Sequence, residues 1–323
     1  MKRTAIAVIG PTASGKSALA LDLSERFGGE IVSCDSMQIY RGMDIGTAKP
    51  TPAERARVKH HMIDILDPDQ PYSAADYGDE AAKVAEEILS RGKLPVFCGG
   101  TGLYLTAVLT GRHGEAPPSD PALRAELSGR GKTEEGRAAL YAELAAIDPA
   151  SAAATHPNNL RRVVRALEIY RLTGKPKSVF DEESRNAQPR FHCLTLGLDF
   201  PERGALYRRI DRRVDQMMAA GLFSEAKTLR ERGYLSPGTT AGQAIGYRQF
   251  LPCFSGESTP EEAAEEIKRA TRRYAKRQLT WFRAQEGILW LDGGDPALAQ
   301  RAADAVSAYL NEKTLFVGGQ KKE

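Results

Sequence analysis

The order of hydrophobic and polar positions separates an α/β part of the chain from a purely helical part. Near the N-terminus, apolar runs of strand length at residues 5–9, 31–34 and 94–98 alternate with helical patterns at residues 18–23 and 76–90. Because strand–helix–strand alternation requires crossover connections, it predicts a parallel sheet with helices on both faces. Ligands bind such sheets at the carboxyl ends of the strands.

A change of pattern predicts the domain boundaries. Near residues 111–121 the composition shifts to glycine, proline and polar residues, and only helical patterns follow, at residues 122–127, 134–147, 160–172 and 178–184. A strand pattern then returns at residues 191–198, followed by helices at 204–219, 224–231 and 260–284 and a strand at 288–291. We therefore predict a discontinuous α/β core at residues 1–113 and 188–313, a helical insertion at 114–187 and a flexible tail at 314–323.

A phosphate-binding loop joins the first predicted strand to the first predicted helix. Its sequence is G-x-x-x-x-G-K-S, formed by Gly10, Pro11, Thr12, Ala13, Ser14, Gly15, Lys16 and Ser17. Glycines let successive N–H groups of such a loop point inward, and the helix start adds the positive end of its dipole. We expect Lys16 to reach the outer phosphate of a di- or triphosphate and the Ser17 hydroxyl to hold Mg²⁺. A glycine-rich turn without a ligand is the less favoured alternative. The fold class predicted is a P-loop NTPase-like parallel sheet core with a helical insertion domain.

Two further segments end at the same predicted edge of the sheet. Asp35 closely follows the strand at residues 31–34, and Gly99-Gly100-Thr101-Gly102 follows the strand at 94–98. Phosphoryl-transfer enzymes of this loop type hold Mg²⁺ with a carboxylate after such a strand, and the glycine turn supplies none. Asp35 is therefore expected either to hold metal or to act as a base. Asp44 and Asp64 lie in predicted loops and are interpreted as solvated carboxylates. The glycines of residues 99–102 are interpreted as a turn that needs positive φ.

Basic residues are concentrated in two segments although the net charge is only +3. Residues 268–283 contain seven Lys or Arg and no acid, and residues 161–177 contain six Lys or Arg relieved by Glu168. Such clusters indicate a polyanionic partner, and solvated helix faces are the alternative. Part of the charge needs no partner, because Thr259, Pro260 and Glu262 form a helix-start signal and late bases stabilise a helix end. Trp281 and Phe282 are expected to be core residues.

Cysteine usage and hydropathy restrict the class of protein. The four cysteines form no C-x-x-C pair and have no histidine at metal-ligand spacing, which argues against zinc. No apolar run approaches the ~20 residues of a membrane span, and no export signal is recognisable. We expect a cytoplasmic protein, with no membrane partner and no obligate protein partner.

Six motifs together resemble the tRNA dimethylallyltransferase (tRNA isopentenyltransferase) family. Besides the phosphate loop they are DSMQIYRGMDIGTAKP at residues 35–50, GGTGLY at 99–104, HPNN with RVVRALE at 156–168, QAIGY at 243–247 and TRRYAKRQLTWFR at 271–283. They span nearly the whole chain in the order of the family. The zinc-finger extension of eukaryotic relatives is absent, so the chain resembles the bacterial form.

The resemblance implies transfer of a dimethylallyl group from its diphosphate to N6 of adenosine at tRNA position 37, next to the anticodon. The phosphate loop would then hold the leaving diphosphate, with Lys16, Arg213 and a Mg²⁺ on Ser17 neutralising its charge. Asp35 would accept the proton of the adenine amine, and Thr101 would help to orient the base.

The resemblance also implies a tRNA-binding surface. An adenosine of the anticodon loop would be flipped into the site, because a stacked base cannot reach it. The basic residues of 268–283 would mostly contact backbone phosphates, and the helical insertion would read neighbouring bases. The residues expected on the RNA side are Asp35, Ser36, Met37, Gln38, Thr101, Arg124, Arg162, Arg165, Gln243, Gly246, Tyr247, Arg248, Arg273 and Arg277.

Three alternative functions are compatible with parts of the sequence. The first is prenylation of a free adenine nucleotide, against which the insertion and the basic clusters argue. The second is a small-molecule kinase that binds ATP through the same loop. The third is a non-catalytic RNA-binding module that uses the basic helices alone.

Overall fold

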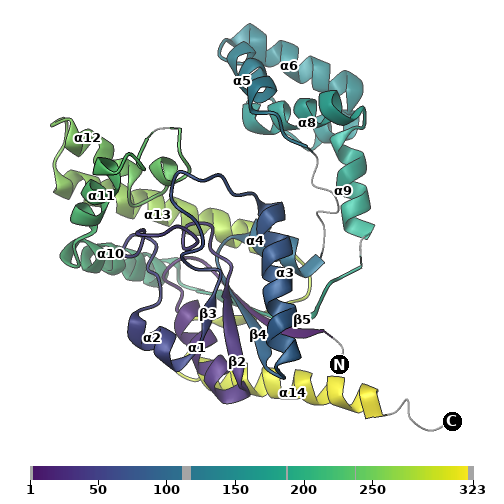
Figure 1. Cartoon of the computed structure of the whole chain (residues 1–323), viewed down its shortest axis with the longest axis vertical. Helices are drawn as coiled ribbons and strands as arrows, with labels where there is room; N and C mark the ends of the chain where they lie inside the picture. The colour runs from purple at the N-terminus through teal and green to yellow at the C-terminus, as the bar shows by residue number, and fades with distance from the viewer. Residues whose placement is uncertain (1–2, 111–117, 187, 237, 319–323) are drawn as a thin grey trace. The chain divides into compact units, whose positions relative to one another are not determined.

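A computed structural model describes residues 3–110, 118–186, 188–236 and 238–318 (Figure 1). The chain forms two compact units, one made of Met1–Leu109 with Arg190–Glu323 and the other of Thr110–Pro189. The insertion predicted at residues 114–187 lies within the second unit. Each unit has its own hydrophobic core and is described by itself.

The first unit is built on a six-stranded parallel sheet, which confirms the predicted fold class. The strand order is β3-β2-β4-β1-β5-β6, and every neighbouring pair is parallel. The strands are β1 (Thr4–Ile9), β2 (Gly29–Ser33), β3 (His60–His61), β4 (Leu94–Gly99), β5 (His192–Asp199) and β6 (Ile288–Asp292). All but the two-residue β3 were predicted from their apolar runs.

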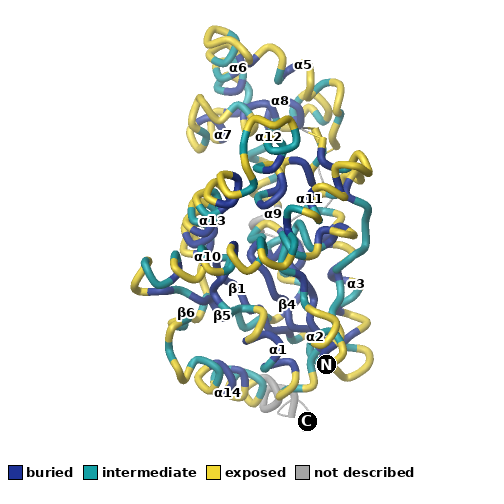
Figure 2. Tube along the Cα trace, turned by 90° about the vertical axis from the view of Figure 1, so that its left-hand side faces the viewer, coloured by how far each residue is buried: buried dark blue, intermediate teal, exposed yellow. Residues whose placement is uncertain are grey.

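Helices cover both faces of this sheet because its strands are apolar on both faces. Along β1, Ala5, Ala7 and Ile9 enter one core cluster, and Ile6 and Val8 enter another. The first cluster includes residues of α3 (Ala74–Ser90) and α4 (Gly102–Thr110), and the second includes residues of α1 (Lys16–Phe27) and α14 (Leu298–Gly318). Figure 2 shows β1 and β4 as buried strands.

A third group of helices packs beyond the carboxyl edge of the sheet. Its core joins the loop after β2, through Ile39, Tyr40 and Met43, to residues of α10, α11 and α13. The helices are α10 (Arg203–Ala219), α11 (Leu222–Glu231), α12 (Leu251–Phe254) and α13 (Pro260–Arg283). Two 3₁₀ turns, η1 (Ala241–Gln243) and η2 (Arg248–Phe250), precede α12. The helix start expected for α13 is confirmed, since Thr259 and Glu262 form both hydrogen bonds of a capping box.

The second unit is helical, as expected for the insertion. It contains α5 (Pro121–Arg130), α6 (Glu134–Ile147), α7 (Pro149–Ala153), α8 (Leu160–Thr173) and α9 (Lys177–Asn186). Leu127, Leu140, Leu144 and Leu167 are fully buried in its core.

Several helices were not predicted from the sequence. Besides α7 and α12, they are α2 (Pro52–Arg57), α4 and α14. Helix α14 continues to Gly318, so residues 314–318 of the predicted tail are helical, and residues 319–323 lie outside the described part. Within the described ranges, no helix combines the length and the apolar character that crossing a bilayer requires.

Candidate active site

The predicted convergence of three segments at one edge of the sheet is confirmed. The register pairs Ile9 with Gly99 and Ser33 with Cys98, so β1, β2 and β4 end together. The loops that follow are hydrogen-bonded, because the Ser36 N–H donates to Thr101 Oγ1 at 3.1 Å. The phosphate loop, Asp35 and the glycine turn therefore lie side by side.

The phosphate loop has the backbone geometry of an anion-binding site. Gly15 has φ 94° and Ala13 has φ 63°, both in the left-handed region. No side chain caps α1, whereas α2, α3 and α13 each carry a capping box. The Ser14 hydroxyl is buried and has no hydrogen-bond partner among the described residues. First-turn N–H groups without a cap, beside an unpartnered hydroxyl, fit a phosphate group.

Two basic side chains and one carboxylate lie close together beside this loop. Burial lowers the pKa of Lys16, and Arg213 lowers it further, while Cys98 and Asp35 act in the opposite direction. Burial also lowers the pKa of Arg213, against the effect of Asp35. Desolvated cations that face one carboxylate are typical of a site that binds an anion.

A cavity of about 330 Å³ connects these groups. It lies at the small end of the ~300–1,000 Å³ typical of ligand sites. Its lining includes Lys16, Ser17, Asp35, Arg213, Tyr274 and Gln278. Predicted RNA-side residues also line it, namely Ser36, Met37, Gln38, Gln243, Gly246, Arg248 and Arg277.

Asp35 is held by one of its two oxygens. Oδ1 accepts the Met37 N–H at 2.9 Å, and among the described residues no group donates a hydrogen bond to Oδ2. The nearby Tyr274 is half-buried, and burial, reinforced by Asp35, raises its pKa to about 12. Asp35 therefore presents an acceptor to the cavity, beside a phenol that remains protonated at neutral pH.

Gln278 is a site residue that the sequence reasoning missed. On α13 it is 6% exposed, its Oε1 accepts the Thr12 N–H at 2.9 Å, and its Nε2 donates to the Gly100 carbonyl at 2.9 Å. One side-chain amide thus ties the phosphate loop to the glycine turn. The RRYAKRQ motif contains this residue, but its role depends on partners far away in the sequence.

The glycine turn corrects an expectation about its backbone. None of Gly99, Gly100 and Gly102 has a positive φ. They are required instead by close packing: a Cβ at Gly99 would lie 2.2 Å from the Cys34 carbonyl oxygen, and one at Gly102 would lie 2.2 Å from the Trp281 ring. Phe282 is 1% exposed and Trp281 packs against the core, as expected.

A larger open groove of about 1,630 Å³ shares Lys16, Ser17 and Arg213 with the small cavity. Arg209 and Arg212 of α10 also line it. Arg209 braces the phosphate loop, because its Nε donates to the Ala13 carbonyl at 2.9 Å. Only Arg213 was predicted, although the i, i+3, i+4 spacing of the three arginines puts them on one face of a helix.

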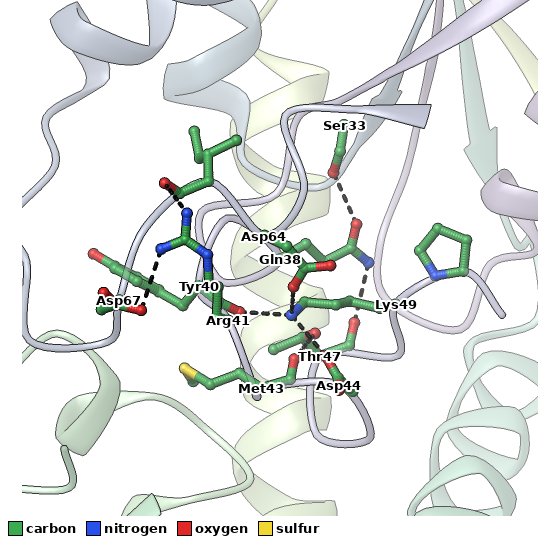
Figure 3. Close-up of polar contacts among 12 residues, drawn as sticks. Ser33, Gln38, Tyr40, Arg41, Met43, Asp44, Thr47, Lys49, Asp64 and Asp67 are labelled. Carbon is green, nitrogen blue, oxygen red and sulfur yellow. Dashed lines mark hydrogen bonds and ion pairs between the residues drawn. The ribbon is translucent and has the colours of Figure 1, made fainter. Parts of the chain in front are cut away.

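The loop after β2 is held by a buried lysine (Figure 3). The Lys49 side chain is 2% exposed, and its Nζ donates to the Tyr40 carbonyl at 2.6 Å and to Asp44 at 2.7 Å. Asp64 also pairs with Lys49. It accepts a further hydrogen bond from Arg55 at 2.9 Å. Burial raises the pKa of Asp64, but these two partners outweigh it and lower the pKa. Asp44 is exposed, as expected of a solvated carboxylate, whereas Asp64 is half-buried; both acids also neutralise Lys49, which the sequence analysis did not predict.

Tyr247 and Thr101 were both predicted to contact the RNA, and the structure gives each a structural role. Tyr247 is 0% exposed and donates to Glu225, so it is a core residue and not a contact surface. The Thr101 hydroxyl is engaged with Ser36, donating to its Oγ at 3.3 Å. Thr101 therefore positions the segment that follows β2, and its role toward a base stays a prediction.

The basic cluster on α13 is partly neutralised by acids of α10, β5 and α13 itself. Lys268 pairs with Asp215 of α10 at 2.6 Å, and Arg272 pairs with Asp211 of the same helix. Arg269 and Arg283 pair with Glu266 and Asp199. Among the described residues, no acid pairs with the bases that remain, Arg273, Lys276 and Arg277.

Two arginines of the second unit are also engaged internally. Glu168 is 0% exposed and accepts hydrogen bonds from Arg124, at 3.0 Å, and Arg165, at 2.7 Å. Removing either would leave a buried carboxylate with fewer partners, so both have a structural role. Arg162 is exposed on α8. Contact of all three with RNA stays a prediction.

Comparison with known proteins gives consistent matches over most of the chain. The model of the IPP transferase family matches residues 38–285, and that of the isopentenyl transferase family matches residues 3–65. A tRNA dimethylallyltransferase of Geobacter sulfurreducens is 50% identical over 90% of this chain and 92% of its own length. One from Roseiflexus sp. is 50% identical over 95% of this chain and 98% of its own length.

Solved structures agree with these matches. The tRNA isopentenylpyrophosphate transferase of Bacillus halodurans superposes with a TM-score of 0.72 at 43% identity, over 98% of this chain and 100% of that one. A eukaryotic dimethylallyltransferase acting on tRNA superposes with a TM-score of 0.80 at 31% identity, over 97% of this chain and 80% of that one. From these matches and the site described above, this chain belongs to the tRNA dimethylallyltransferase family of enzymes.

Proposed function

We propose that this enzyme transfers the dimethylallyl group of dimethylallyl diphosphate to N6 of adenosine 37 in tRNA. The observation that carries the proposal is one cavity that contains both an uncapped phosphate loop with Lys16 and Arg213 and a single carboxylate, Asp35. The relatives reported above support the same assignment, because their names state that they act on tRNA.

The donor diphosphate would lie on the phosphate loop. The first N–H groups of α1, the Ser14 hydroxyl and the Lys16 ammonium are the groups suited to its oxygens. Charge develops on the diphosphate as the allylic C–O bond breaks, so cations fixed in a desolvated site stabilise the transition state more than the ground state. Arg213 would supply the second positive charge.

Magnesium fits the donor end through Ser17. Mg²⁺ usually takes one or two protein ligands together with substrate phosphates and waters. The exposed Ser17 lines both the cavity and the groove, so its hydroxyl is accessible for this purpose. Bound there, the ion would supply positive charge to the leaving diphosphate.

Asp35 would act on the acceptor amine. The lone pair of an adenine amine is delocalised into the ring, so the nitrogen needs a hydrogen-bond acceptor to aim and activate it. The N6 nitrogen forms a bond to the allylic carbon as that carbon loses the diphosphate, and the displaced N6 proton passes to an Asp35 carboxylate oxygen. Atoms and charge then balance, and the products are isopentenyladenosine and diphosphate.

The RNA would approach with its adenosine turned out of the anticodon loop. Arg248 and Arg277 line the cavity and are exposed, and Arg273 lies on the same helix as Arg277. These bases are suited to phosphates near the flipped nucleotide, and their contribution would weaken as salt rises. Arg162 in the second unit would contact the anticodon region.

A labelling experiment tests the proposal. Purified protein is incubated with radiolabelled dimethylallyl diphosphate, magnesium and a tRNA that lacks the modification, with a tRNA carrying guanosine at position 37 as the matched control. We expect label in the first tRNA and none in the second. Parallel incubations receive AMP or ATP in place of the tRNA. Label in AMP alone would refute the proposal in favour of a free-nucleotide acceptor, and release of ADP from ATP without prenyl transfer would favour a kinase.

A further inference from the structure

We propose that Glu225 is a positioning residue for the acceptor: from α11 it holds the loop of residues 44–46, which shapes the wall of the small cavity. The inference rests on the proposed function, because it concerns how the cavity recognises the acceptor. Glu225 lies outside every motif on which the family resemblance is based. It is joined to this loop across about 180 residues of sequence.

The Glu225 carboxylate is fully used by hydrogen bonds from the loop and its neighbour. Oε2 accepts the Asp44 N–H at 3.0 Å and the Ile45 N–H at 2.8 Å. Oε1 accepts the Gly46 N–H at 3.0 Å and the Tyr247 hydroxyl at 2.8 Å. A carboxylate offers about four acceptor positions, so these four donors occupy all of them.

The hydrogen-bond donors around Glu225 are suited to a side chain that carries a negative charge. Among the described residues, no lysine or arginine pairs with Glu225, so its charge faces only backbone N–H groups and a phenol. Three consecutive N–H groups that converge on one anion form a nest, and hydrogen bonds to an ionised group are about twice as strong as neutral ones. The charge of Glu225 thus fixes the conformation of the loop.

Packing of Gly46 against the Tyr247 ring also holds the loop of residues 44–46 in place. A Cβ at Gly46 would lie 2.5 Å from the Tyr247 ring, so only glycine allows the loop to approach this closely. Tyr247 is fully buried, and both burial and Glu225 raise its pKa, which keeps its hydroxyl protonated as a donor. Glu225 and Tyr247 therefore form one support for the loop.

The supported loop leads directly to residues of the cavity. Gly46 and Thr47 line it, and the Thr47 carbonyl accepts from Gln38 Nε2 at 3.2 Å, which orients a third lining residue (Figure 3). The phosphate loop has separate supports in Gln278 and Arg209. Release of residues 44–46 is therefore expected to disturb the acceptor and to leave the donor in place.

The test compares Glu225→Gln with Glu231→Gln, an exposed glutamate on the same helix that pairs at 4.0 Å with Lys227. The glutamine is isosteric but turns an NH₂ group toward two of the four donors. We expect the KM for tRNA to rise about tenfold, with kcat and the KM for dimethylallyl diphosphate within about twofold of wild type, because the lost interaction acts on binding alone. Glu231→Gln should match wild type in all three.

An unchanged KM for tRNA in folded Glu225→Gln would overturn the inference, as would an equal rise of both KM values or a fall in kcat alone. If Glu225→Gln fails to fold in a thermal melt, Tyr247→Phe carries the test, because it removes one donor and keeps the ring beneath Gly46. Its KM for tRNA should rise about threefold, and no rise would refute the inference. Absence of transfer by the wild type would refute the proposed function instead.

Discussion

On one side of the small cavity the phosphate loop, residues 10–17, follows β1 without interruption, whereas the remaining wall combines residues from segments 35–47, 98–99, 210–217, 243–248 and 267–278. The loop has its shape from local features, namely Gly15, the positive φ of Ala13 and the start of α1. The remaining wall depends on contacts between segments that are distant in sequence. The comparison teaches that the backbone of the anion site is a local motif, while its second cation, Arg213, and the recognition of the acceptor depend on the packed fold.

The largest expected effect separates chemistry from donor binding. Asp35→Asn keeps the size of the side chain but cannot accept a proton, so kcat should fall about 10²- to 10⁴-fold. The affinity for dimethylallyl diphosphate should stay within about twofold, because the phosphate loop is intact. Single-turnover transfer to tRNA and equilibrium binding of the donor measure the two quantities.

Asp69→Asn, an exposed aspartate in the loop that follows β3, is the matched control for that variant. It should behave as wild type. Full turnover of Asp35→Asn would show that the proposed base is wrong, and equal losses in turnover and donor affinity would break the separation between the two sides.

Gln278→Leu tests the one side chain that joins the two sides. The variant leaves the Thr12 N–H and the Gly100 carbonyl without their partner, so both loops should lose their fixed positions. We expect kcat/KM to fall about 10- to 50-fold for donor and acceptor alike. Gln300→Leu, at an exposed position on α14, is the control, and an effect on only one substrate would contradict the bridging role.

The pH dependence of donor binding tests the charge on the phosphate side. Burial lowers the pKa of Lys16 below the ordinary 10.5, so this ammonium loses its proton at lower pH than an exposed lysine does. Because the protonated form binds the diphosphate, donor affinity should decrease as the pH rises through that lowered pKa, by about tenfold on full neutralisation. Calorimetric titration of the donor at several pH values measures the change.

Lys16→Arg provides the comparison, since a guanidinium stays charged over the same range. Its donor affinity should show no such decrease. The same pH dependence in Lys16→Arg would assign the titration to another group.

The smallest expected effect concerns the basic face of α13. Arg273 has no acidic partner among the described residues, whereas Arg269 pairs with Glu266. Arg273→Ala should weaken tRNA binding about threefold. It should also reduce the slope of log K against the logarithm of the salt concentration by about one. Arg269→Ala should change the affinity and its salt dependence less than Arg273→Ala does. Filter binding at several salt concentrations measures both quantities. A larger effect of Arg269→Ala would show that internal ion pairs do not determine which basic side chains contact the tRNA.

Much of the site was predictable because its chemistry lies in short motifs. The phosphate loop, Asp35 and the glycine turn were identified, and the sheet brings their segments to one edge. Arg213 of α10 was also identified, and it lines the same cavity. Tyr247 was wrongly predicted to contact the RNA, because a tyrosine in a motif can either pack in the core or contact a ligand. Only its burial in the structure distinguishes the two roles. Gln278, Arg209 and Glu225 were missed because an amide, an arginine or a glutamate on a helix has no local pattern that reveals a distant partner.

By itself the sequence determined the strands, the phosphate loop and the helical nature of the insertion, since strand periodicity, glycine conformation and helix caps act over a few neighbouring residues. The tertiary structure alone decided which charges are neutralised and which side chains hold the cavity. Gln278 reaches the phosphate loop across 266 residues, and Arg209 reaches it across 196. Such contacts depend on where packing places whole helices, and that placement follows from burial of apolar surface distributed over the entire chain.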